Sequence, residues 1–156
     1  MYHLVRLGAA LALGLLPSVT LAEEALLTLT MGDSTRTYDR AALEALGETE
    51  FTTTTIWTEG PQTFTGVPLN VLLADAGIAT GTLSARAIND YAVEIPVDEA
   101  LEDGPIVAYT RNGAPMSVRD KGPLWLVYPY DSDPAFQTEV VFSRSIWQLD
   151  RLEATQ

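Results

Sequence analysis

The chain has 156 residues, of which 47% are hydrophobic and 19% are charged, with 21 acidic residues against 9 basic ones. This length fits one domain with a sizeable core, and the composition is that of a globular chain rather than a disordered one. The formal net charge of −12 argues against a nucleic-acid partner, because phosphate binding requires a basic surface. The absence of cysteine excludes disulfides, zinc–thiolate sites and a cysteine nucleophile.

The first 22 residues have the pattern of a secretory signal peptide. Arg6 precedes an apolar run over residues 7–16, and Thr20-Leu21-Ala22 offers small residues before a cleavage point. The apolar run is shorter than the ~20 residues that span a bilayer. The pattern predicts export to the periplasm or another exported compartment, cleavage after Ala22, and a mature domain of residues 23–156 that is not inserted in a membrane.

Cleavage also changes the chemistry that the chain can perform. It removes His3, the only histidine, and leaves Lys121 as the only lysine. A mature chain without imidazole or thiol cannot run a Ser–His–Asp or Cys–His mechanism. The remaining carboxylates, hydroxyls, guanidinium groups and aromatic rings suit binding better than catalysis.

The first third of the mature chain predicts strands and one helix. Residues 26–31 alternate as a strand does. Asp39 is placed to cap a helix over residues 40–46, and Gly47 is placed to end it. The β-branched run over residues 51–58 is typical of a strand.

A second helix follows, and then two strands. Pro68 favours the start of a helix over residues 69–76, which Gly77 ends. Apolar residues at the spacing of one helix face are Leu69, Leu72, Leu73 and Ala76. Residues 83–89 and 91–95 are strand-like.

Short elements complete the chain. Residues 97–101 suggest a helical turn, and residues 106–110 a strand that runs into Asn112-Gly113, a strong hairpin signal. Residues 124–128 and 146–152 are two further candidate strands. Because most elements are short strands and only two are clear helices, the predicted class is α+β, mainly β, in a single domain.

Five segments, in order along the mature chain, resemble the molybdopterin-binding domain of sulfite oxidase-like oxidoreductases. They are residues 65–77 (TGVPLNVLLADAG), 89–96 (NDYAVEIP), 112–116 (NGAPM), 122–129 (GPLWLVYP) and 144–147 (RSIW). The resemblance implies a sulfite oxidase-type fold that normally holds a pterin cofactor. Some exported domains of this kind are thought to bind free pterins and to report to a membrane-bound enzyme of cyclic dinucleotide metabolism.

The chain departs from that family where the resemblance implies contacts to molybdenum and to the cofactor phosphate. The metal-ligating cysteine would fall in the threonine run near Thr53 to Thr55, and the two basic cofactor contacts are met by Trp125 and Trp147. An indole has one N–H group and no charge, so it cannot replace a guanidinium group on a phosphate. These departures argue against molybdenum and favour a flat, uncharged ligand such as a simple pterin.

Eight residues are candidates for ligand binding, and no catalytic or metal-binding residue is predicted. They are Asn89, Asp90, Tyr91, Arg119, Asp120, Lys121, Trp125 and Tyr128. Trp125 and Tyr128 are placed either to stack on a heteroaromatic ring or to pack in the core, where Trp57 and Trp147 are also expected.

The polar candidates also carry two readings. Asn89 and Asp90, before Tyr91, would accept hydrogen bonds from two adjacent N–H groups of a ligand, or they would form an Asx turn. Arg119 and Lys121 would hold a carbonyl or carboxylate group, and Asp120 would accept from a pterin amino group. Alternatively, Arg119 pairs with Asp120 in a solvated turn. A separate acidic patch is expected as a solvated face or as a docking surface for a basic partner. It comprises Asp98, Glu99, Glu102 and Asp103.

Three functions remain open from the sequence. The first is an exported, non-catalytic pterin-binding module that modulates a membrane receptor through its extracytoplasmic domain. It predicts an open concave site lined by Trp125, Tyr128 and polar loop groups. The second is a molybdopterin-dependent oxidoreductase. The third is a protein-interaction scaffold with no small ligand, which predicts a pocket filled by its own side chains.

Overall fold

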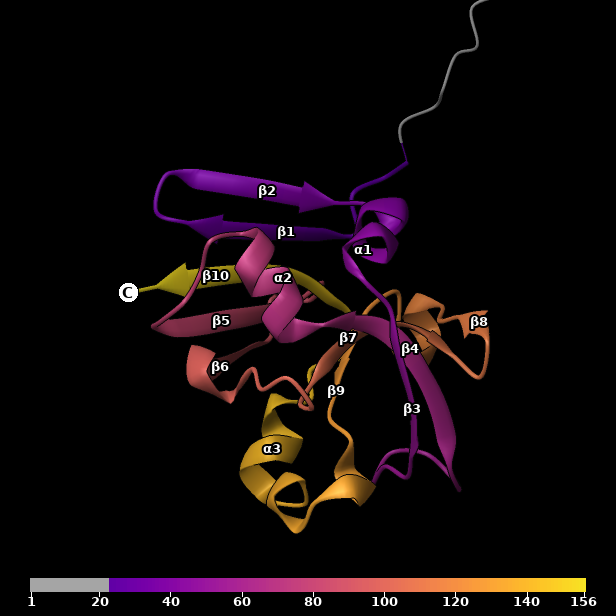
Figure 1. The fold of residues 1–156 in the computed structure, drawn as a ribbon. Coiled ribbons are helices and arrows are strands. Elements are labelled where there is room, and N and C mark those ends of the chain that lie inside the picture. The colour runs from indigo at the N-terminus through magenta and orange to yellow at the C-terminus, as the bar shows by residue number, and fades with distance from the viewer. Residues whose placement is uncertain (1–22) are drawn as a thin grey trace, which may run out of the picture.

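The computed structural model describes residues 23–156, which form two β-sheets with short helices packed along them (Figure 1). The predicted signal peptide, residues 1–22, lies outside the described residues. Within residues 23–156, no helix combines the length and the apolar character needed to cross a bilayer.

The first sheet joins the two ends of the described chain. Its five strands, in spatial order, are β2 (Ser34–Tyr38), β1 (Leu27–Met31), β10 (Leu149–Thr155), β5 (Thr82–Ala87) and β6 (Ala92–Pro96). β1 and β10 are parallel, and all other neighbours are antiparallel. The central position of β10 means that the C-terminal strand completes this sheet.

The second sheet carries the middle of the chain. Its strands are β3 (Thr49–Thr53), β4 (Gln62–Pro68), β7 (Ile106–Arg111) and β8 (Ala114–Pro115), with β9 (Trp125–Val127) also paired to β7. β4 and β7 approach closely at Gly66, where a Cβ atom would overlap the carbonyl oxygen of Val107. Glycine is therefore required at this position of the strand.

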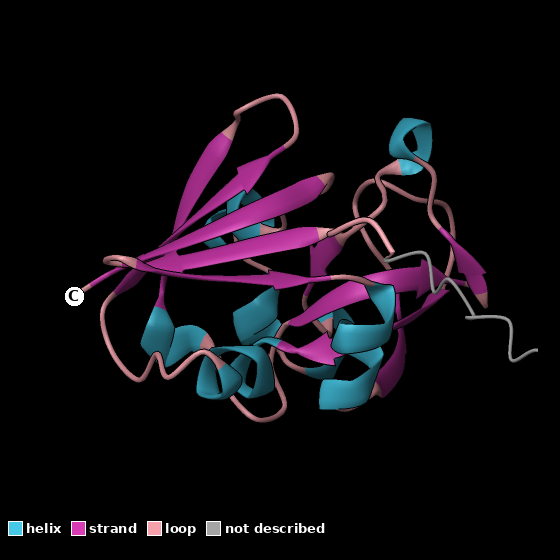
Figure 2. Ribbon diagram, turned by 90° about the horizontal axis from the view of Figure 1, so that it is seen from above, coloured by secondary structure: helices cyan, strands magenta, loops and turns pink. Residues whose placement is uncertain are grey.

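In the described part of the chain, three α-helices and four short 3₁₀ helices connect the strands. They are α1 (Arg40–Leu46), α2 (Leu69–Asp75), α3 (Glu139–Arg144), η1 (Val97–Glu99), η2 (Val118–Asp120), η3 (Tyr130–Ser132) and η4 (Pro134–Phe136). The Asp39 carboxylate caps α1 by accepting a hydrogen bond from the backbone N–H of Ala42 at 2.8 Å. Figure 2 shows several helical segments gathered along one side of the strands.

The buried side of α2 links it to the core. Leu69, Leu72 and Leu73 are fully or almost fully buried, and burial of each is worth about 1.5–3 kcal/mol relative to exposure. The α+β, mainly β class predicted from the sequence is confirmed, as are both helices and the strand that opens the chain. The Asn112-Gly113 hairpin is also confirmed, with φ angles of 52° and 77°.

Five elements differ from the sequence prediction. The strand expected over residues 51–58 is wrong beyond Thr53, because the backbone N–H of Thr54 leaves the sheet and donates to Asp131 Oδ2 at 2.7 Å. The final strand begins at Leu149 rather than at residue 146. β2, β4 and α3 were not predicted.

Candidate ligand-binding groove

A groove of about 350 Å³ lies between the β5–β6 turn, the loop after β3 and α3. We call it the aromatic groove. The side chains that shape it are Trp57, Asn89, Tyr91, Phe142, Ser143, Ser145, Trp147 and Gln148. Its volume falls within the range of small-molecule sites, roughly 300–1,000 Å³.

Trp57 is the centre of the aromatic wall. Its ring lies edge-on to Trp147 at 5.6 Å, to Phe142 at 5.9 Å and to Trp125 at 5.9 Å between ring centroids. Edge-to-face pairs at these separations add a favourable interaction energy to the free energy gained by burying the rings. The groove is therefore backed by mutually supported rings that come from three distant parts of the chain.

Trp125 and Tyr128 are buried in the core. The indole Nε1 of Trp125 donates to the carbonyl oxygen of Ser145 at 3.2 Å, and Phe64 packs edge-on against the ring at 5.2 Å. The structure thus gives these two residues the core-packing role that the sequence left as the alternative. A stacking contact on Trp125 would require the aromatic cluster to open.

Trp57 and Trp147 were expected in the core; Trp57 packs against the core and also lines the groove, whereas Trp147 is exposed there. Trp57 is half-buried, and the side chain of Trp147 is 36% exposed. The expectation was wrong for Trp147, and the turn after Thr53 brings Trp57 against the C-terminal segment that carries this residue. A sequence signal for Trp147 existed, since residues 144–147 form one of the five segments that resemble a pterin-binding family.

Lys121 lies beside Trp147, one of the rings that line the groove. Its Nζ atom is 4.2 Å from the centroid of the Trp147 ring and 5.7 Å from that of Trp125. A cation at these distances from an indole face is attracted to it. Of the predicted ligand-binding residues, Lys121 and Trp125 are therefore brought together.

One lining residue of this groove has a left-handed backbone conformation. Among the non-glycine residues of the described chain with positive φ, Gln148 at 53° lines the groove, and Asp90 at 67° and Lys121 at 70° lie in segments next to its lining residues. Gln148 ties the neighbouring loops together, because its Nε2 atom donates to the carbonyl oxygen of Val118 at 2.6 Å and its own carbonyl oxygen accepts from Ile88 at 3.0 Å. Residues held in such conformations are enriched at ligand-binding sites.

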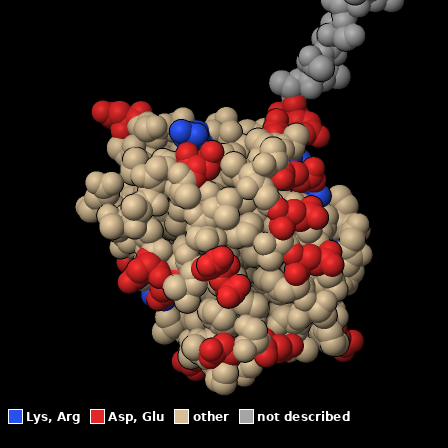
Figure 3. Space-filling model, viewed as in Figure 1, with Lys and Arg blue, Asp and Glu red and all other residues tan. Residues whose placement is uncertain are grey.

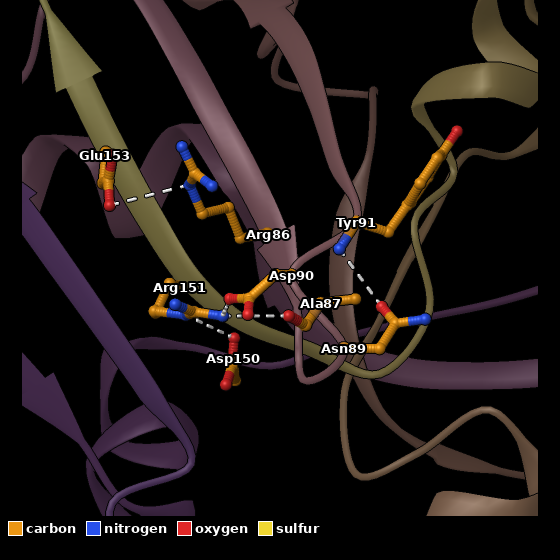
Figure 4. A network of polar contacts seen from close by, with 8 residues as sticks. All are labelled: Arg86, Ala87, Asn89, Asp90, Tyr91, Asp150, Arg151 and Glu153. Atoms are coloured by element: carbon orange, nitrogen blue, oxygen red, sulfur yellow. Dashed lines mark hydrogen bonds and ion pairs between the residues drawn. The ribbon is translucent and has the colours of Figure 1, made fainter.

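The three predicted residues of the β5–β6 turn separate into two groups (Figure 4). Asn89 Oδ1 accepts from the backbone N–H of Tyr91 at 3.2 Å, and both side chains line the groove. Asp90 instead accepts a hydrogen bond from Arg151 at 2.6 Å. The hydrogen bond and charge of Arg151 lower the pKa of Asp90. Asp90 is therefore a structural ion-pair partner on the side away from Tyr91.

Arg119 and Asp120 do not line the aromatic groove. Asp120 accepts from Arg111 Nη2 at 2.6 Å, rather than from Arg119 as the sequence alternative proposed. Arg119 is exposed on η2. The loop therefore places Lys121 over the Trp147 ring, while Asp120 pairs with Arg111 and Arg119 is exposed.

The oxygen atoms near the expected metal position are already hydrogen-bonded. The Thr53 hydroxyl accepts from the backbone N–H of Asp131 at 3.0 Å, and the Thr54 hydroxyl donates to Asp131 Oδ1 at 2.6 Å. Residues 23–156 contain no group of three or more histidine, cysteine, aspartate or glutamate side chains that could hold a metal. Since a soft metal centre favours thiolate ligands, these residues do not fit a thiolate-bound molybdenum centre.

The two sheets, with a C-terminal strand at the centre of the first, define a mainly β domain of the sulfite oxidase type. The family model of the oxidoreductase molybdopterin-binding domain matches residues 21–132. The match covers most of the chain, and the protein belongs to this family. A comparison with curated proteins finds no match. The matched range includes Trp57, Asn89, Tyr91 and Lys121, whereas α3 and Trp147 lie beyond it.

Proposed function

We propose that this protein is an exported, non-catalytic pterin-binding module that modulates a membrane-bound signalling partner. One observation carries the proposal: a member of the molybdopterin-binding family has a groove walled by aromatic rings, and threonines occupy the expected position of the metal-ligating cysteine. Pterin binds in the aromatic groove, with Trp57 and Trp147 as its walls. Export rests on the signal-like pattern of residues 1–22, and the partner rests on the resemblance to exported pterin-binding domains.

The side chains around the groove suit a flat ring with a polar edge. Aromatic walls stack on a heteroaromatic ring, and each stacking contact is worth about 1–3 kcal/mol. The amide of Asn89 offers N–H donors, and the Gln148 amide offers a carbonyl oxygen. The Lys121 ammonium group lies over the Trp147 ring, where it would pair with a carbonyl oxygen of a pterin that stacks beside this indole.

A pterin titration tests the proposal directly. The protein purified after export is titrated with oxidised and with tetrahydro pterins, by quenching of tryptophan fluorescence and by calorimetry. We expect saturable binding, and we expect Trp147→Ala to weaken it by about 5- to 150-fold, the equivalent of losing one stacking contact of ~1–3 kcal/mol. Leu101→Ala is the matched control, because Leu101 is 55% exposed and lies outside the aromatic groove.

Two outcomes would contradict the ligand-binding role. If no pterin binds, the scaffold function that the sequence left open takes precedence. If Trp147→Ala binds as tightly as the parent protein, the aromatic groove is not the site. The intact mass of the exported protein tests the remaining element, since export with cleavage predicts Glu23 as the first residue.

A further inference from the structure

A second groove, of about 480 Å³, lies on the other side of α3 and does not belong to the pterin site. We call it the acidic groove. Asp98, Glu99 and Leu101 form one wall, and Val140 and Arg144 of α3 form the other. α3 thus separates the two grooves, with Phe142 facing the aromatic groove and Val140 facing the acidic one.

The walls of the acidic groove present unpaired aliphatic surface. Leu101 is 55% exposed and Val140 is 54% exposed, and they belong to opposite walls. Phe136 and Val141 continue the apolar lining between them. Apolar side chains surrounded by a polar rim are typical of protein-interaction sites.

The rim of the groove is negatively charged. Asp98 and Glu99 line it, and Glu102 and Asp103 follow on the same segment, where they line a neighbouring cavity. Arg144 is the only basic residue that lines the groove, and it is engaged by Glu99 and by the carbonyl oxygen of Glu94. Acidic side chains also far outnumber basic ones on the face shown in Figure 3. This surface is complementary to a positively charged partner.

The floor of the groove holds a buried polar atom with no partner. Tyr128 is 1% exposed, and its hydroxyl group makes no hydrogen bond within the described part of the chain. Burial, followed by the nearby charge of Glu99, raises the pKa of this hydroxyl, which therefore stays protonated as a donor. A buried hydroxyl without a partner is unfavourable, so a polar atom brought into this groove would relieve it.

We propose that the acidic groove is a docking surface for a segment of another protein that presents an apolar side chain flanked by lysine or arginine. The apolar side chain inserts between Leu101 and Val140, and the flanking cations pair with the carboxylates around η1. A polar atom of the same segment pairs with the Tyr128 hydroxyl once the side chains that cover this hydroxyl move aside. A second copy of this chain is a poor occupant, because its net charge of −12 would be repelled by the same rim.

The test uses blocked synthetic peptides as defined probes. One peptide has a central leucine flanked on each side by two arginines, a second replaces the leucine with serine, and a third replaces the arginines with glutamates. Each is titrated into the full protein, labelled at its methyl groups, at physiological salt. We expect the leucine–arginine peptide to shift the signals of Leu101 and Val140 saturably. We expect at least tenfold weaker binding of the serine peptide and no binding of the glutamate peptide.

A pair of matched variants locates the site. Val140→Glu should weaken binding of the leucine–arginine peptide by at least tenfold, whereas Val118→Glu should leave it unchanged, since Val118 is 51% exposed on η2 and outside the groove. Leu101→Ser serves in place of Val140→Glu if that variant fails to fold.

Three results would overturn the proposal. Equal affinity for the leucine and serine peptides would mean that charge alone attracts them. Absence of saturable binding would remove the docking surface. Self-association that shifts Leu101 and Val140 without any peptide would make a second copy the occupant. Pterin affinity is measured on the same variants, so failure of the pterin site and failure of the docking surface are distinguishable.

Discussion

The two grooves on either side of α3 differ in what shapes them. The aromatic groove is built from large rings held edge-on, and Lys121 is the charge closest to them. The acidic groove is built from short aliphatic side chains and carboxylates. The six-residue helix α3 thus separates an aromatic groove that suits a flat ring from an acidic groove that suits a peptide segment. Because both grooves share its backbone, occupancy of one can alter the other.

The largest expected effect is loss of the aromatic wall through Trp125→Ala. Removal of this buried ring leaves Phe64 and Trp57 without their common neighbour, and we expect the free energy of unfolding to fall by about 3–5 kcal/mol. Urea denaturation measures this loss, with the exposed Trp147→Ala as the control that should lose much less. Similar losses in both variants would mean that the cluster is not organised around a buried ring.

A smaller effect, shared by both grooves, is expected from Ser145→Ala. The Ser145 hydroxyl accepts from Tyr130 at 2.6 Å and donates to the carbonyl oxygen of Val141 at 2.9 Å, which anchors the end of α3. Its removal leaves the Tyr130 hydroxyl buried and unpaired, at a cost of about 1–3 kcal/mol.

Hydrogen exchange of the α3 amides measures how much the Ser145 hydroxyl stabilises the helix. We expect faster exchange in Ser145→Ala and little change in Ser143→Ala, because the Ser143 hydroxyl is exposed and bonds only within its own helix, to Val140. Equal protection of α3 in the two variants would show that the helix is held by its apolar contacts alone.

The smallest expected effect is the pH dependence of the loop that carries Trp57. Hydrogen bonds from Thr54 lower the pKa of Asp131 below its ordinary value of 3.8. Since the lowered pKa belongs to the folded state, the stabilisation is present at neutral pH and is lost as the pH falls below about 3.8.

Asp131→Asn should reduce the loss of unfolding free energy that occurs as the pH falls into the acidic range. The carboxylate is solvated, so the difference is expected to stay within about 1 kcal/mol. Denaturant midpoints between neutral and acidic pH measure it, and Thr54→Val should give the same reduction by removing the donor hydroxyl. If the denaturant midpoints of both variants fall with pH as steeply as those of the parent protein, other carboxylates cause the acid sensitivity.

Local signals in the sequence predicted the elements that depend on neighbouring residues. Asp39 and Gly47 bound α1 as expected, and Asn112-Gly113 forms its hairpin, because caps and tight turns are set within a few residues. β4 was missed because Gly66 and Pro68 lower its strand propensity. Its pairing with β3 and β7 overrides that local preference.

The aromatic site could be predicted only in outline. Family-like segments indicated that Trp125 and Trp147 lie near the pterin position, but not which ring is exposed. That choice depends on Trp57, whose contacts to Trp125 and Trp147 join residues far apart in the chain. α3 gave no usable signal either, because only Val141 among its six residues is fully buried, so no apolar stripe marks the helix.

The position of the single lysine has a spectroscopic consequence. Lys121 carries the only side-chain amine in the sequence, and that amine lies over the indole ring of Trp147. Reductive methylation with isotope-labelled formaldehyde would therefore label the chain at one side chain, and the ring current of the indole would displace its resonance from that of the labelled α-amino group. A lining residue of the aromatic groove, Trp147, thus has a natural reporter beside it, whose signal moves when a ligand displaces the amine from the ring.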